Sequence, residues 1–429
     1  MRFLNCAVCW VLAVAAPTSP PAPVRTAVTH VTVIDVRSGL AKPDMTAVLF
    51  QGRIESVGPA AAAHVGRSAR IIDGRGRYLI PGLWDMHVHE GDNERALRLM
   101  LAAGITGVRD MGSDVEKLRE ARRRLRTGEW TGPRLVFAGP MLEGPPSEAA
   151  SDTWIVRTPE EATRAVKLLA SEGVDFIKVH DNLARDTYRA IADAARTSGL
   201  PFAGHVSAST TPLEASNLGQ KSIEHLEFVP QPCRVLFEPA GPARSIPAEC
   251  DDTALRAMLQ AFAANGTWLD PTIGSFRYFA PEQWPAIFAG FRALALPIRQ
   301  SGVRILTGTD QSGYLEDKGD IPGRSLHDEL ALLVEAGFTP AEVLRAATLN
   351  AAVFLGLGDS LGTVEAGKVA NLVLLEANPL QDIRNTRRIV AVIVEGRVVG
   401  RSTVVQNARR YCRGTGASAP SARAACNGQ

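Results

Sequence analysis

The sequence has little net charge, few aromatic residues and no hydrophobic run long enough to span a membrane. Its 429 residues include 47 lysines and arginines and 45 aspartates and glutamates, which gives a formal charge of +2. No segment concentrates lysines together with aromatic residues as nucleic-acid-binding surfaces do, so we expect no nucleic-acid partner. The hydrophobic fraction of 45% is that of an ordinary globular chain, long enough for one large barrel or for several domains.

The first 16 residues have the features of a secretory signal peptide. An arginine precedes a short apolar core, small residues at Val14 and Ala16 suit a cleavage site, and residues 17–24 form a proline-rich linker. The apolar core is shorter than the roughly 20 residues that a spanning helix needs. We therefore predict a secreted or periplasmic protein with no stable membrane span after cleavage.

Cysteine is scarce in the rest of the chain. The four remaining cysteines lack the spacing of a zinc or redox motif, and their even number in an oxidising compartment predicts disulfides. Cys233 lies close to Cys250 in the sequence, and Cys412 lies close to Cys426. These two pairs are our prediction, although four cysteines allow three connectivities.

Between residues 81 and 362, short apolar segments alternate with helical patterns. The apolar residues of 188–195 recur at helical spacing, and Thr158, Thr211 and Thr339 each precede a proline and a glutamate, as helix caps do; Ser325 begins a related pattern. Eight strands are expected, in the segments LWDMHVH, TGVRDMG, RLVFAG, DFIKVH, PFAGHV, SIEHLE, TWLDPTI and RILTGTD. This alternation predicts an α/β fold with a (β/α)8 TIM barrel over residues 81–362.

The segments that flank the barrel are rich in strands and turns and have little helical pattern. Residues 25–80 and 363–405 are expected to form one small β-sandwich domain built from both chain ends, with the barrel inserted between them. Residues 406–429 form a tail rich in alanine, serine and arginine. Phe228 to Asp251 interrupts the barrel pattern with several prolines, and we expect it to form a rim or lid over the barrel mouth.

Side chains suited to metal binding lie near the ends of five of the predicted strands. Two of them are two residues apart, so both imidazoles point to the same face of the first strand. Because the carboxyl ends of barrel strands meet at one face, we expect these groups to form a metal site. The candidate ligands are His87, His89, Lys178, His205, His225 and Asp310.

The segments PGLWDMHVH, FIKV, GHV, IEHLE, TGTD and GTVEAGKVANLVLLEANPLQDI resemble the amidohydrolase superfamily over nearly all of the mature chain. More narrowly, the sequence is similar to the imidazolonepropionase-like and Xaa-Pro dipeptidase branch, in which a lysine of the fourth strand is carboxylated and bridges two divalent metals. The resemblance implies two divalent ions, which we predict to be zinc. It places His87, His89 and Asp310 on the first ion, His205 and His225 on the second, and Lys178 on both.

The side chain of Lys178, in a strand that is expected to be buried, could be in one of two chemical states. A low-dielectric site favours the neutral amine, which can add carbon dioxide to form a carbamate. The alternative is an ammonium group paired with Asp175 or Asp181, because buried charges are usually paired. A bare ammonium beside two divalent cations would be electrostatically unfavourable, so we predict the carbamate on Lys178.

These features predict an enzyme that hydrolyses C–N bonds in amides or peptides, such as a dipeptidase or an N-acyl amino acid hydrolase, by means of a metal-bridging hydroxide. Asp310 would take a proton from the attacking water and pass it to the departing amine, and His180 would contact the substrate. Tyr314, Arg324 and Arg109 are candidates for binding a substrate carboxylate.

Three alternatives remain open. A heterocycle deaminase or imidazolone ring hydrolase would generally carry an acidic residue or glutamine three positions after the fifth-strand histidine, where this chain has Ala208. A lactone or organophosphate ester hydrolase could use the same two-metal constellation. A non-catalytic scaffold barrel would be expected to have lost ligands. The partner is a small-molecule substrate in each enzymatic case; the exact substrate, the metal and the oligomeric state, a homo-oligomer included, stay open.

Overall fold

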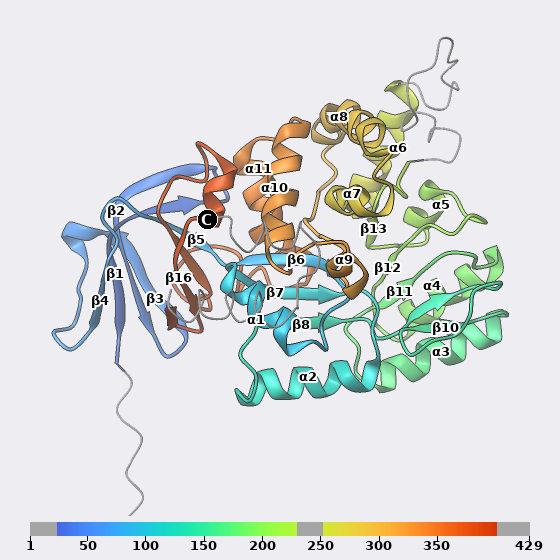
Figure 1. Cartoon of the computed structure of the whole chain (residues 1–429), viewed down its shortest axis with the longest axis horizontal. Helices are drawn as coiled ribbons and strands as arrows, with labels where there is room; N and C mark the ends of the chain where they lie inside the picture. Colours follow the sequence, from blue (N-terminus) through green and yellow to red (C-terminus); the bar gives the residue numbers. More distant parts are fainter. Residues whose placement is uncertain (1–23, 230–251, 401–429) are drawn as a thin grey trace, which may run out of the picture.

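The computed structural model describes residues 24–229 and 252–400, which form a mixed α/β fold (Figure 1). The predicted signal peptide, the tail, nearly all of the linker and the suggested lid, and the four cysteines of the predicted disulfides lie outside the described residues. Within residues 24–229 and 252–400, no helix combines the length and the hydrophobicity that crossing a bilayer requires.

Both ends of the chain contribute to one eight-stranded sheet, on the left in Figure 1. Its strand order is β17-β16-β15-β5-β1-β2-β3, and β4 pairs with β1. The antiparallel pairing of β5 with β15 joins the two chain ends. The strands are β1 (Thr26–Asp35), β2 (Leu40–Phe50), β3 (Arg53–Pro59), β4 (Arg70–Asp73), β5 (Tyr78–Pro81), β15 (Leu372–Leu375), β16 (Ile389–Val394) and β17 (Arg397–Gly400).

This sheet has a hydrophobic core of its own. Side chains that alternate along its strands, among them Val31, Leu79 and Leu372, form one buried cluster. A bridge between Arg53 and Val369 brings the edge strand β3 back to the residues that precede β15. The predicted two-layered sandwich is not confirmed, because the strand pairing is continuous through all eight strands.

The rest of the described chain contains two further sheets, in which all strands pair in parallel. One sheet has the order β6-β7-β8, and the other has the order β10-β9-β11-β12-β13-β14. The strands are β6 (Leu83–Val88), β7 (Ile105–Asp110), β8 (Arg134–Phe137), β9 (Met141–Glu143), β10 (Thr153–Ile155), β11 (Ile177–Val179), β12 (Phe202–Gly204), β13 (Ser222–Glu224) and β14 (Trp268–Asp270).

The expected closed barrel of eight strands is not found in this pairing. The predicted eighth strand is an irregular segment, residues 304–311, which joins the two sheets by isolated bridges from Leu269 to Ile305 and from Val88 to Gln311. On the other side, the Asp175 amide donates a hydrogen bond of 2.9 Å to the Phe137 carbonyl. Several of the strands are only three residues long, so individual hydrogen bonds replace continuous ladders there.

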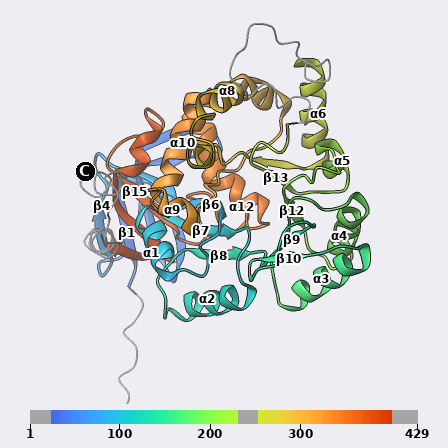
Figure 2. The same cartoon turned by 45° about the vertical axis from the view of Figure 1, so that its right-hand side comes forward.

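Helices cover the outer side of these sheets, as the view in Figure 2 shows for α2, α3 and α4. The α-helices are α1 (Glu94–Ala102), α2 (Val115–Thr127), α3 (Pro159–Ser171), α4 (Arg185–Thr197), α5 (Pro212–Asn217), α6 (Asp252–Asn265), α7 (Phe276–Phe279), α8 (Trp284–Ser301), α9 (Gly313–Asp317), α10 (Arg324–Ala336), α11 (Pro340–Arg345) and α12 (Ala351–Phe354). Short helical turns are η1 (Ala60–Ala62), η4 (Ile273–Ser275), η5 (Ala346–Asn350) and η6 (Ile383–Arg387).

Three of the predicted helix caps are confirmed and one is wrong. Thr158, Thr211 and Thr339 each accept a hydrogen bond from the backbone of the third helical residue, and a proline begins each helix. Ser325 does not cap α10, because that helix begins one residue earlier, after Gly323. The Ser325 hydroxyl instead donates a hydrogen bond to Gln311.

Candidate metal centre

The six predicted ligands come from strand ends of both parallel sheets and from the joining segment. His87 is the second-to-last residue of β6, and His89 directly follows that strand; Lys178 is the central residue of β11. His205 and His225 directly follow β12 and β13, and Asp310 lies in segment 304–311.

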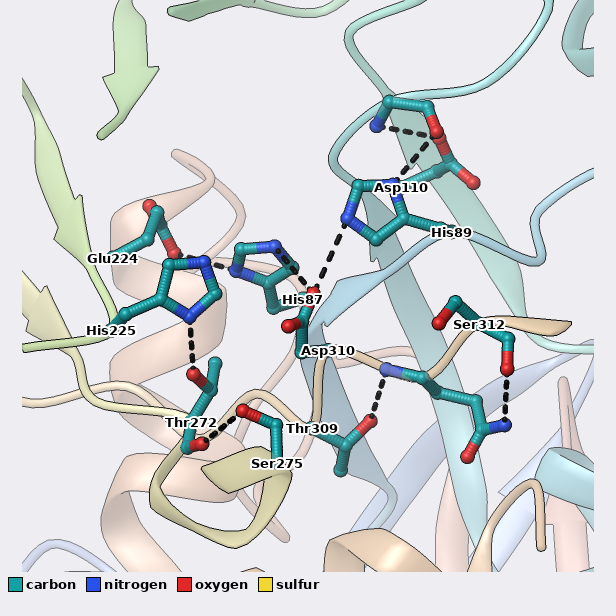
Figure 3. Close-up of polar contacts among 12 residues, drawn as sticks. His87, His89, Asp110, Glu224, His225, Thr272, Ser275, Thr309, Asp310 and Ser312 are labelled. Carbon is teal, nitrogen blue, oxygen red and sulfur yellow. Dashed lines mark hydrogen bonds and ion pairs between the residues drawn. The ribbon is translucent and has the colours of Figure 1, made fainter. Parts of the chain in front are cut away.

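Figure 3 shows Asp310 together with the imidazoles of His87, His89 and His225. Asp310 Oδ1 lies 3.4 Å from Nε2 of His87 and 3.4 Å from Nε2 of His89. The ring of His225 lies between two others, with its centroid 4.8 Å from that of His87 and 4.7 Å from that of His205. The ligand atoms of His87, His89 and Asp310 all lie within 4.8 Å of one another, so these three residues could hold a metal ion.

All four imidazoles use Nδ1 for a partner within the protein, which leaves Nε2 available to a ligand. A carboxylate or a carbonyl only accepts hydrogen bonds, so Nδ1 carries the proton wherever the partner is one of these. Such outer contacts orient metal-binding imidazoles and fix their tautomer. The pairs are His87 with Glu224 (3.1 Å), His89 with the Gly112 carbonyl (2.8 Å), His205 with Asp181 (3.1 Å) and His225 with the Thr272 hydroxyl (2.6 Å).

The donor set fits a cation for a second reason. His87 Nε2 is buried and has no hydrogen-bond partner in the described part of the chain. Burial, followed by the nearby Lys178, lowers the pKa of His87 well below its usual value, so this ring is neutral, as metal ligation requires. Burial also lowers the pKa of His225 to about 4. Burial opposes the charge on Asp310, but the imidazoles of His225 and His89 outweigh it and lower its pKa.

Beneath the histidines lies a buried ion-pair network that the sequence interpretation missed. Glu224, the partner of His87, also accepts a hydrogen bond of 2.9 Å from Arg109, whose guanidinium lies 3.3 Å from Asp270. Arg109 donates further hydrogen bonds to Ser222 and to a backbone carbonyl. Its predicted role in binding a substrate carboxylate is therefore wrong, because its donors are directed to protein groups and its side chain is fully buried.

Lys178 is fully buried, at 0% exposure. Burial lowers the pKa of its amine to about 8, which is the direction that makes a neutral amine available. Neither predicted carboxylate partner pairs with it, since Asp175 pairs with Arg122 at 2.9 Å and Asp181 with His205. Gly204 makes space for the lysine stem, because a Cβ at this position would lie 2.9 Å from Lys178 Cδ.

His180 lies beside the four imidazoles. Its ring centroid is 4.1 Å from that of His205, and its Nδ1 donates a hydrogen bond to Glu143. Glu143 is buried at the end of β9, and its other oxygen accepts a hydrogen bond of 2.7 Å from the Gly144 amide. The structure thus holds His180 in one orientation at the edge of the centre.

The two remaining substrate-binding candidates are not brought into the metal cluster. Tyr314 lies on α9, four residues after Asp310, and is 51% exposed. Arg324 begins α10, where its side chain is half exposed and lies 3.7 Å from Asp328. The structure gives neither side chain a contact with the four imidazoles.

Three residues of the centre adopt the left-handed backbone region that non-glycine residues rarely occupy. The φ angles are 54° for His225, 41° for Thr272 and 60° for Asp310. Such backbone strain persists only where the surrounding structure imposes it, and it is common at functional sites. Each of these residues turns the chain sharply at the end of a strand or of the joining segment.

Sequence interpretation missed Glu224, Thr272 and Glu143, and it considered Asp181 as a partner of Lys178 and not of His205. One signal was available for the first of these, because an acidic residue inside a buried strand needs a partner. The others give no such signal. Thr272 and Glu143 are separated from their imidazole partners by 47 and 37 residues, so only the folded chain pairs them.

Comparisons with known proteins show which family this chain resembles. Residues 78–399 match the model of the amidohydrolase family. The ochratoxinase of Aspergillus niger is 25% identical over 377 residues, which cover 71% of this chain and 72% of that protein. The imidazolonepropionase of Pseudomonas putida is 27% identical over 392 residues, which cover 77% of this chain and 87% of that protein.

A solved structure from Bifidobacterium longum, described as a prolidase, superposes with a TM-score of 0.70 at 27% identity. It covers 88% of this chain, and the match spans 94% of that chain. The family match extends over most of the described residues and includes all six strand-end groups. The chain belongs to the amidohydrolase family.

Proposed function

We propose that this amidohydrolase-family hydrolase cleaves amide or peptide bonds of small substrates, as a dipeptidase or an N-acyl amino acid hydrolase, with two divalent ions, zinc by preference. The observation that carries the proposal is the set of four imidazoles whose Nδ1 atoms are held by the protein while Nε2 stays available beside Asp310. Similarity to a protein described as a prolidase supports the choice of peptides.

In this proposal the six groups divide as the family resemblance implies. His87, His89 and Asp310 would hold one ion, His205 and His225 the other, and Lys178 both. When bound, such ions supply a polarised substrate carbonyl and a water of lowered pKa.

The role of Lys178 requires a covalent change. Its neutral amine would attack carbon dioxide, so that a bond forms between Nζ and carbon while one C=O π bond breaks. The nitrogen would release a proton to water, which leaves a carbamate with two oxygen donors. The full burial of Lys178 and the lowered pKa of its amine support this step, because both favour the neutral nucleophile.

Two residues would handle protons and the substrate. Asp310, kept ionised by the neighbouring imidazoles, would accept a proton from the attacking water at its carboxylate and return it to the departing nitrogen. His180, fixed by Glu143, would donate a hydrogen bond to a substrate oxygen. Because both side chains are held in place, a bound substrate would be held in a fixed orientation relative to them, which favours reaction.

The test combines metal analysis with a hydrolysis screen of dipeptides and N-acyl amino acids. Wild-type protein should hold about two ions per chain, and Lys178→Ala should lose metal and more than about 100-fold in turnover, with partial rescue by short carboxylic acids. Lys167→Ala, on the exposed face of α3, is the matched control and should behave like the wild type. Full metal content and full turnover in Lys178→Ala would refute the carbamate.

A second candidate is hydrolysis of a heterocyclic ring, favoured by the 27% identity to imidazolonepropionase. Two residues argue against this candidate. Such ring hydrolases generally use one metal and carry an acidic residue or glutamine where this chain has Ala208, and a carboxylated Lys178 would serve a two-metal site. The same metal analysis separates the two, since one ion per chain would favour the ring hydrolase.

A further inference from the structure

Two aromatic rings lie partly exposed on the short helices α7 and α9. Phe279 of α7 and Tyr314 of α9 stack with their centroids 5.3 Å apart and their planes inclined by 12°. They are 48% and 51% exposed. The rings cover part of one another, and the Lys318 amine lies 4.7 Å from the centroid of the Tyr314 ring, so the accessible aromatic surface is the part of each ring that remains exposed.

This aromatic pair lies within reach of a substrate at the metal centre. Tyr314 follows Asp310 by four residues, and four residues of chain span at most about 14 Å. The first residue of α9, Gly313, lies beside the side chain of Glu90, the residue after His89. Figure 1 draws α7 and α9 next to one another, on the side of the molecule where the strands of the parallel sheets end.

Helix α7 is also hydrogen-bonded to the residues that directly follow α9. The Tyr278 hydroxyl donates a hydrogen bond of 3.4 Å to Asp320, and the Lys318 amine donates one of 3.3 Å to the Tyr278 carbonyl. Both contacts connect α7 to the segment that carries α9. A surface ordered in advance loses less entropy when it binds a ligand, so these hydrogen bonds favour a binding role over incidental exposure.

We infer that Phe279 and Tyr314 bind an aromatic or extended apolar group of the substrate and so select amides that carry such a group on the acyl or the amino side. This inference rests on the proposed amide hydrolysis and adds the substrate class. The rings bind and orient the substrate and take no part in bond cleavage. Exposed aromatic rings favour aromatic partners in stacked or edge-to-face contact.

The experiment uses metal-loaded protein and two matched substrate pairs, N-acetylphenylalanine with N-acetylalanine and N-benzoylglycine with N-acetylglycine. In at least one pair the aromatic member should have the higher kcat/KM. Phe279→Ala and Tyr314→Ala should each reduce that ratio about three- to tenfold, mainly through KM.

Two controls isolate the ring. Tyr314→Phe keeps the ring and should keep the ratio, whereas Leu296→Ala removes a 52%-exposed apolar side chain on α8 and should change nothing. An unchanged ratio in both alanine variants, or an equal loss for both members of a pair, would overturn the inference. If the wild type hydrolyses none of the four compounds, the proposed function fails. The aromatic selection is then tested separately by calorimetry, which compares the affinities of the aromatic and the non-aromatic compounds for the wild type and for the same variants.

Discussion

At the residue scale, the orientation of His87 depends on Glu224. This buried carboxylate accepts hydrogen bonds from both His87 and Arg109, so a neutral amide in its place would leave the imidazole and the guanidinium without a common anion. We expect Glu224→Gln to lower the affinity for metal about 10- to 100-fold, the usual cost of losing an outer partner of a metal-binding histidine.

Titration of the loaded protein with a chelator measures this affinity, and circular dichroism checks that the variant is folded. The matched control is Glu214→Gln, which removes a carboxylate from the surface of α5. Equal metal affinities of Glu224→Gln and Glu214→Gln would contradict the role of Glu224.

Gly204 is the second residue on which the centre depends. Its φ of 132° is outside the range of most side chains, and a Cβ there would collide with the Val179 carbonyl and the Lys178 stem. Gly204→Ala should therefore lower the thermal midpoint strongly and reduce metal content. Gly199→Ala provides the comparison, because it has a positive φ of 69° but open space around it, and should cost only about 1 kcal/mol.

The candidate ligands could be predicted from the sequence because their signal is local. His87 and His89 are two apart on a strand, and each of the other ligands lies in or next to a strand-like segment. Their partners could not be predicted, since Glu224 is 137 residues from His87, and the choice among nearby acids is made by tertiary packing. The role of Arg109 could not be predicted either, because the neighbouring sequence does not show whether its guanidinium is buried in an ion-pair network or free to bind a substrate.

At the element scale, the helix starts were predictable and the strand pairing was not. Threonine followed by proline and glutamate acts through side-chain contacts within one turn, so sequence suffices. The predicted cap at Ser325 is wrong because the helix begins directly after Gly323, which has a φ of 87°, and the Ser325 hydroxyl donates its hydrogen bond to Gln311. The eighth barrel strand is not regular, because residues 304–311 pair with their neighbours only through isolated bridges at Ile305 and Gln311, which no local pattern predicts.

The cap of α11 gives the prediction at this scale. Thr339 accepts a hydrogen bond from the Glu342 amide, and Glu342 accepts one of 2.7 Å from the Thr339 amide. Thr339→Ala should lower the free energy of unfolding by about 1 kcal/mol, measured by urea denaturation. Thr197→Ala is the control, because its hydroxyl only contacts a carbonyl one turn earlier in α4, and should be nearly neutral. Equal effects of the two changes would contradict the cap.

At the scale of the whole molecule, buried carboxyl groups make stability depend on pH. Burial raises the pKa of Glu329 to about 8, although the amides of Gly274 and Ile273 donate hydrogen bonds to it. The folded chain therefore holds a proton here that the unfolded chain, with a glutamate pKa of about 4.3, has released. Stability from this group is complete below about pH 4 and is lost as the pH rises toward 8, by up to about 1.4 kcal/mol per pH unit.

Urea denaturation of the chelated protein between pH 5 and 8 measures this slope without metal linkage. Glu329→Gln cannot titrate and should show a flatter curve than the wild type. Glu120→Gln is the control, because its exposed partners, Arg123 and Arg124, lower the pKa of Glu120 to about 2 and place its own transition below this window. Parallel curves for Glu329→Gln and the wild type would show that Glu329 does not hold the proton.

The metal centre also has a structural consequence for the molecule. His87 and His89 belong to the sheet of β6, β7 and β8, Lys178, His205 and His225 to the six-stranded sheet, and Asp310 to the segment between them. Ions bound by these groups would connect two sheets that are otherwise joined by isolated bridges. Ligands that bind only the folded state stabilise it, by about 2.7 kcal/mol at a concentration of 100 Kd.

Chelation should therefore lower the thermal midpoint and increase amide hydrogen exchange unevenly along the chain. The increase is expected at the ends of β6, β12 and β13, where the ligands lie, and in residues 304–311. The backbone of residues 304–311 is hydrogen-bonded to β6 in one sheet and to β14 in the other. The sheet of β1 to β5 and β15 to β17 has its own buried core and serves as the internal control, so its exchange should stay the same. Uniform exchange changes over both regions would mean that the ions stabilise the chain generally, and unchanged exchange would mean that they do not connect the two sheets.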